Sequence, residues 1–74
     1  MALVIKISEG IKDRSSIHKI TDCSFFVIEN NGEKYLQLDT FGSDDRQITG
    51  KVSQSIQFSP AAIIELKKIL NSRF

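Results

Sequence analysis

A two-residue turn signal constrains the fold of this chain more than any other feature. Asn31 and Gly32 lie between two strand-like runs, residues 25–29 and 35–41. This dipeptide tolerates the positive φ angles that a tight β-hairpin turn requires. In the second run the side chains alternate, so that Leu36 and Leu38 share one face and Tyr35 shares the other with its polar neighbours. The sequence therefore predicts an antiparallel hairpin centred on Asn31 and Gly32.

Two further strands and a helix complete the predicted layout. Residues 2–7 are apolar and β-branched, and residues 52–58 alternate between a largely apolar and a wholly polar face. Ser59 suits the N-cap of a helix, and Pro60 suits the first helical position, where its missing N–H costs nothing. An apolar stripe at helical spacing follows: Ala62, Ile63, Leu66, Ile69, Leu70 and Phe74.

These elements predict one domain, residues 1–74, of the α+β class: a twisted antiparallel sheet of about four strands followed by one C-terminal helix. Residues 8–21 are polar or turn-forming, and we expect an excursion there with a short strand around residues 17–20. The polar stretch between Gly42 and Gly50 predicts a long loop.

The composition excludes several classes of protein. Cys23 is the only cysteine, which rules out an internal disulfide framework and favours a reducing, cytoplasmic location. No apolar run approaches the roughly 20 residues that cross a bilayer, so we expect no membrane partner. Ten Lys and Arg against nine Asp and Glu give a net charge of +1. Because nucleic-acid binders usually carry a strong basic excess, any charge-driven binding must come from a local patch.

Catalysis has little support in the sequence. His18 and Cys23 are the only histidine and cysteine, and no third group at a recognisable spacing orients them as a nucleophile pair. The chain also falls short of the usual zinc ligand sets, and the loop after Gly42 lacks the ending of a phosphate-binding loop. We therefore expect a protein that binds rather than catalyses, with no cofactor and no metal.

The sheet face opposite the helix is the best candidate surface. If Leu36 and Leu38 face the helix together with Val52, Ile56 and Phe58, aromatic and short polar side chains occupy the other face. The expected members are Phe25, Val27, Tyr35, Gln37, Phe41, Ser53, Ser55 and Gln57. Exposed rings among hydrogen-bonding side chains suit single-stranded nucleic acid, whose bases stack on them. Alternatively, Phe25 and Tyr35 form a cross-strand pair that only stabilises the hairpin, or they line a protein interface.

The order of the elements resembles a known family. Gly50-Lys51 before a strand with a central Ile56, the Ser59-Pro60 helix start and the Leu-Lys helix resemble the end of the positive cofactor four family of transcriptional coactivators. The resemblance covers residues 25–70, and Pur-alpha repeats share the same order of strands and helix. Both families are dimeric or dimer-like and bind single-stranded nucleic acid on their sheets. The chain departs from them in its low net charge and in its more polar strand at residues 53–58.

The resemblance and the surface pattern together predict a small homodimer that binds single-stranded nucleic acid, most readily DNA, in transcription, replication or repair. Phe25 and Tyr35 would stack on bases, while Lys51, Arg46 and Lys34 would meet phosphates. The dimer would have its helix at or near the interface, because Ile64 lies off the sheet-facing stripe. The alternative function is a protein-interaction or regulatory module without nucleic-acid binding.

Overall fold

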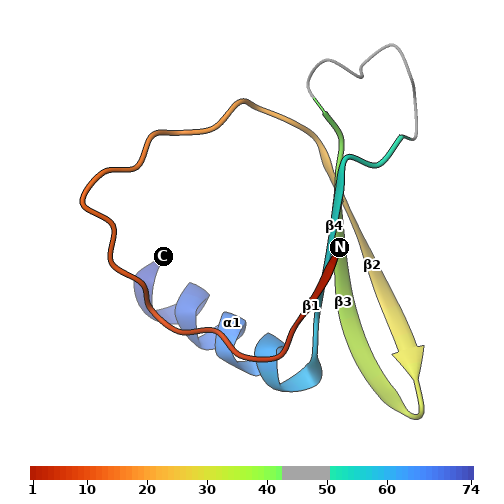
Figure 1. The fold of residues 1–74 in the computed structure, drawn as a ribbon. Coiled ribbons are helices and arrows are strands. Elements are labelled where there is room, and N and C mark those ends of the chain that lie inside the picture. Colours follow the sequence, from red (N-terminus) through yellow and green to blue (C-terminus); the bar gives the residue numbers. More distant parts are fainter. Residues whose placement is uncertain (43–50) are drawn as a thin grey trace.

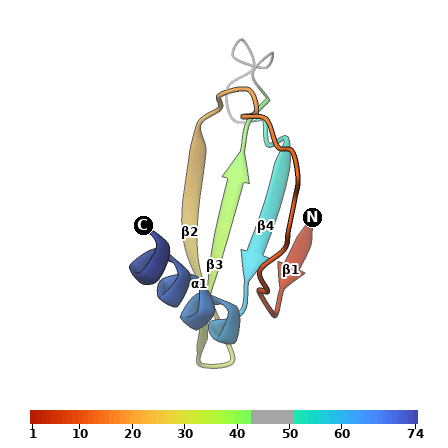
Figure 2. The ribbon, with the colours of Figure 1, turned by 90° about the vertical axis from the view of Figure 1, so that its left-hand side faces the viewer.

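A mixed four-stranded sheet and one C-terminal helix make up the fold, seen in a computed structural model that describes residues 1–42 and 51–74 (Figure 1). The elements are β1 (Ala2–Val4), β2 (Cys23–Asn30), β3 (Glu33–Thr40), β4 (Gln54–Phe58) and α1 (Pro60–Arg73). In the sheet they are ordered β1-β4-β3-β2, so β1 and β2 are the two edges (Figure 2). The predicted α+β class with four strands and a C-terminal helix is confirmed. Most of the predicted loop after Gly42 lies outside the described residues.

The hairpin between β2 and β3 follows the sequence signal. Asn31 and Gly32 have φ angles of 53° and 79°, as a type I′ turn requires at both central positions. Asn30 pairs with Glu33 across this turn, and the antiparallel register then runs without interruption to Cys23 and Thr40. Because directly opposite residues point to the same side of a sheet, the turn alone determines which side chains share a face.

The first strand differs from the prediction. It spans three residues instead of residues 2–7, and it pairs parallel to β4, with Leu3 opposite Gln57, in a sheet predicted to be wholly antiparallel. Parallel neighbours need a long connection between them, and here the chain passes through two other strands before β4. The short strand predicted around residues 17–20 is absent, because those residues have no strand partner in the described part of the chain.

The helix begins where its capping residues predict. Ser59 has an extended backbone and its Oγ accepts a hydrogen bond from the Ala62 amide at 3.2 Å. Pro60 occupies the first turn, where no intrahelical partner for an N–H is lost. The Ser59 amide donates to the Val4 carbonyl at 2.9 Å, which ties the helix start to β1.

The core lies between α1 and the middle of the sheet, and it is thin. The helix packs on β3 and β4, where Leu36, Leu38, Ile56 and Phe58 form the apolar helix side of the sheet. These four side chains are only half-buried, and Ala62 is the one fully buried apolar residue among those described. Figure 1 shows the reason: α1 leaves the sheet at an angle, so that its C-terminal end lies far from the strands.

Residues 5–22 run from β1 past the helix to the start of β2 (Figure 1). Glu9 forms an ion pair with Arg73 at 2.9 Å, and the Ile7 amide lies 3.5 Å from a Glu65 carboxylate oxygen. At the far end Thr21 donates a hydrogen bond to the Phe41 carbonyl. These contacts hold the two ends of the segment but leave three of its isoleucines, Ile11, Ile17 and Ile20, almost wholly or largely exposed.

Candidate nucleic-acid interface

The face of the sheet turned away from α1, called the outer face below, is the surface that the sequence singled out. Cross-strand pairing places Gln37 opposite Gln57 and Asp39 opposite Ser55, while Leu3 adjoins Gln57 from β1. On the other side of β3, Phe26 faces Gln37 and Ile28 faces Tyr35. The outer face thus joins two aromatic rings to a polar centre, and the prediction that Tyr35, Gln37, Ser55 and Gln57 share it is confirmed.

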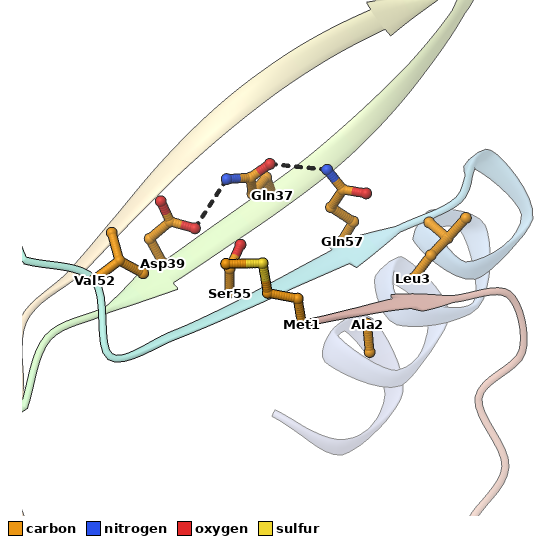
Figure 3. Close-up of a pocket in the computed structure, with 8 residues that line it drawn as sticks. All are labelled: Met1, Ala2, Leu3, Gln37, Asp39, Val52, Ser55 and Gln57. Carbon is orange, nitrogen blue, oxygen red and sulfur yellow. Dashed lines mark hydrogen bonds between the residues drawn. The ribbon is translucent and has the colours of Figure 1, made fainter.

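A chain of hydrogen bonds organises the centre of the outer face. Gln57 Nε2 donates to Gln37 Oε1 at 2.9 Å, and Gln37 Nε2 donates to Asp39 Oδ1 at 2.9 Å (Figure 3). Asp39 is only 7% exposed, the one buried charged residue among those described. These two hydrogen bonds between Gln57, Gln37 and Asp39, called the amide ladder below, orient the amide groups of both glutamines. The second carboxylate oxygen of Asp39 and the carbonyl oxygen of Gln57 take no part in these two hydrogen bonds.

A shallow pocket of about 420 Å³ lies over the ladder. Its polar wall is Gln37, Asp39, Ser55 and Gln57, and its apolar wall comes from the N-terminus and from the residues before β4 (Figure 3). Val52 belongs to that apolar wall, which corrects the expectation that it faces the helix. The reason is that β4 begins only at Gln54, so the strand alternation does not extend to Val52. One polar and one apolar wall suit a flat ring with hydrogen-bonding edges.

The two aromatic residues predicted to stack on bases lie on opposite faces. Tyr35 is on the outer face, half-buried, with its hydroxyl 3.3 Å from a Glu33 carboxylate oxygen. Phe25 pairs with Leu38 and therefore lies on the helix side, and Val27, opposite Leu36, lies there too. The prediction that Phe25 and Val27 share the outer face is wrong, because a two-residue turn brings Phe25 opposite Leu38.

Phe26 is the outer-face ring that the sequence analysis missed. Its side chain is 46% exposed. Because it lies opposite Gln37, two residues from Tyr35 on β3, it is diagonal to Tyr35 on the same face. Diagonal neighbours are about 7–8 Å apart, within reach of aromatic side chains. The signal was present in the sequence: counting outward from Asn31 and Gly32 assigns Phe26, and not Phe25, to the face of Tyr35.

The predicted phosphate contacts are dispersed. Lys34 is exposed near the hairpin turn, where it pairs with Glu29 on the helix side. Lys51 is exposed at the opposite end of the sheet, two residues before Ser53, whose amide bonds to the Thr40 carbonyl. Arg46 lies outside the described residues. Of the predicted site residues that lie in described strands, Tyr35 is on the outer face, while Phe25 and Lys34 are on the helix side.

Other kinds of site find no support in the described residues. Residues 1–42 and 51–74 contain no group of three His, Cys, Asp or Glu side chains able to hold a metal ion. Within the same part of the chain, no helix has the length and apolar character needed to cross a membrane.

No family model matches the chain, and no curated protein or solved structure matches it either.

Proposed function

We propose that this chain binds single-stranded nucleic acid on its outer face, as a small homodimer acting in transcription, replication or repair. One observation carries the proposal: the outer face places Phe26 and Tyr35 beside the amide ladder of Gln37, Gln57 and Asp39. Rings with exposed π-faces bind unpaired bases by stacking, and oriented amides complete the contact at the base edges.

Each part of this surface has a separate role in the proposed complex. The rings stack on successive bases, which accounts for roughly 1–3 kcal/mol per base. The carboxylate of Asp39 accepts hydrogen bonds from the amino group of a base, and the amide of Gln57 meets another polar edge. We infer binding without catalysis, and a cytoplasmic location that keeps the exposed thiol of Cys23 reduced.

Phosphates are expected at the ends of the sheet and not at its centre. The buried carboxylate of Asp39 repels them from the middle of the outer face. Lys51 is exposed at the Thr40 end of β3. Tyr35 lies five residues from Thr40, about 17 Å along the strand. Lys34 and Arg46 are secondary candidates in the same proposal. A net charge of +1 implies few phosphate contacts and a shallow dependence of affinity on salt.

The test is a titration of labelled single-stranded and duplex DNA, and of single-stranded RNA, at two salt concentrations. We expect single strands to bind more tightly than duplex, because the bases of a duplex are already stacked. Tyr35→Ala and Phe26→Ala should each cost roughly 1–3 kcal/mol of binding free energy with an unchanged salt slope. Lys51→Ala should instead flatten the slope of log affinity against log salt by about 0.7 for each lost phosphate contact.

Phe74→Ala is the matched control, because it removes a ring that is 93% exposed at the end of α1, away from the outer face. It should bind like the unaltered protein. Equal affinity for single strands and duplex, or unchanged binding by both Tyr35→Ala and Lys51→Ala, would contradict the proposal.

A second candidate function is a protein-interaction module, and one observation favours it. Large apolar side chains remain exposed on the helix side of β2 and on α1: Phe25, Val27, Ile64 and Leu70. Phe25 and Val27 are neighbours on one face of β2, and exposed apolar side chains grouped in this way are typical of protein interfaces. If neither single strands nor duplex bind the purified protein, this function replaces the first.

A further inference from the structure

The strand β2 presents a free backbone edge along its whole length. It is eight residues long, lies at one edge of the sheet and, within residues 1–42 and 51–74, pairs only with β3. Alternate amide and carbonyl groups of an edge strand point outward without a partner in the sheet. Such an edge is a template for pairing with another strand.

Little in β2 protects this edge from pairing. Its residues, Cys-Ser-Phe-Phe-Val-Ile-Glu-Asn, contain no proline and no lysine, and the unbroken register with β3 leaves no bulge. Glu29, next to the turn, is the only charge. Edge strands of monomeric proteins normally carry one of these protective devices. The opposite edge, β1, is protected by its length, since it spans only three residues.

The side chains of β2 are as uncovered as its backbone. Phe25 and Val27 are 70% and 62% exposed on the helix side, because α1 packs on β3 and β4. Phe26 is partly exposed on the outer face. When another strand pairs with such an edge strand, cross-strand contacts between apolar side chains stabilise the pairing on both faces of the sheet.

The surface area of the whole chain is large enough to accommodate contact with a second copy. The chain has 6720 Å² of accessible surface, whereas folded monomers of 8.3 kDa average about 4,600 Å². Its radius of gyration is 14.4 Å against about 11 Å for a compact chain of this length. The excess of about 2,100 Å² per chain is larger than the roughly 800 Å² that each partner buries in a standard interface.

We propose that β2 forms the seam of the homodimer, pairing antiparallel with β2 of a second copy about a two-fold axis. The inference rests on the proposed homodimer but not on nucleic-acid binding. Opposite residues must share a face, so the axis passes through a residue of β2. With the axis at Phe26, Phe25 of each copy faces Val27 of the other, and the two Phe26 rings meet on a continuous outer face.

Disulfide trapping tests this register directly. In a Cys23→Ser background, Phe26→Cys places two thiols at the axis, where opposite Cα atoms are about 4.5–5.5 Å apart, within disulfide range. We expect this variant to form a covalent dimer rapidly under mild oxidation. The unaltered protein is the matched control. Its Cys23 residues would be six positions apart along the seam, about 20 Å, and should not link despite their exposure.

Charge insertion gives an independent readout by light scattering. Phe26→Lys puts like charges opposite each other across the axis and should reduce the mass from twice 8.3 kDa to 8.3 kDa. Ile64→Lys tests the helix interface that the sequence predicted instead, and with β2 as the seam it should leave the dimer intact. A dimer that neither links through position 26 nor responds to Phe26→Lys would overturn the β2 seam while the proposed homodimer stands. A monomeric mass for the unaltered protein at micromolar concentration would overturn both. Neither readout depends on nucleic acid.

Discussion

Asp39 shows how a single buried charge can be accommodated on a face that is otherwise open. Its carboxylate is 7% exposed and accepts a hydrogen bond from the amide of Gln37, which in turn accepts from Gln57. A buried carboxylate without partners costs several kcal/mol, so this bond both stabilises Asp39 and orients the two glutamines. The acceptors that face the pocket are therefore held by contacts between β3 and β4.

Removing the carboxylate should destabilise the fold through the donor it leaves behind. Asp39→Ala leaves the Gln37 amide without its acceptor and should lower the free energy of unfolding by roughly 1–3 kcal/mol. Asp39→Asn keeps an acceptor oxygen at the same place and should cost less. Urea unfolding at one protein concentration measures both variants. Equal losses for the two would show that the ladder does not stabilise the sheet.

At the scale of elements, the β2–β3 hairpin determines the layout of both faces. Its two-residue turn places Phe25 and Val27 on the helix side and Phe26 on the outer face. This turn depends on two residues with positive φ, Asn31 and Gly32. A change that strains this turn therefore acts on the register of the whole sheet.

Gly32→Ala should destabilise the protein by about 1 kcal/mol, because a Cβ is unfavourable at its φ of 79° even though no atom lies within 4 Å of the site. Gly10→Ala is the matched control. Its site is equally open and its backbone does not have a φ in the left-handed region. Thermal unfolding should show a lower midpoint for Gly32→Ala alone. If both variants melt like the unaltered protein, strain at the turn is not the cause.

For the molecule as a whole, the decisive feature is that one chain does not complete its own core. Ala62 is the only fully buried apolar residue among those described, while Phe25, Val27 and Leu70 stay more than half exposed. A chain of this size has little free energy to spare when so few side chains are covered. In the proposed homodimer, association with a second copy would contribute directly to the stability of the fold.

Stability should accordingly depend on protein concentration. For a homodimer, a hundredfold increase in concentration adds about 2.7 kcal/mol to the apparent free energy of unfolding, whereas a monomer gains nothing. Thermal unfolding across that range measures the shift in midpoint. Phe26→Lys should melt at a midpoint independent of concentration. A midpoint of the unaltered protein that does not move would show that each chain is stable alone.

The sequence by itself determined the features that depend on neighbouring residues. Asn31 and Gly32 specify the hairpin, Ser59 and Pro60 specify the helix start, and alternation along β3 and β4 specifies a polar and an apolar face. The position of Phe26 was also determined, through the two-residue turn, although the initial face assignment chose Phe25.

Only the tertiary structure decided how distant segments meet. The parallel pairing of β1 with β4, the angle at which α1 leaves the sheet and the bond between Gln57 and Gln37 join residues far apart in the chain. Local preferences bias the φ and ψ angles of a few residues at a time, and these biases do not select among long-range contacts. Such contacts form only when the whole chain packs, and they determine which apolar surface the helix covers and which it leaves free.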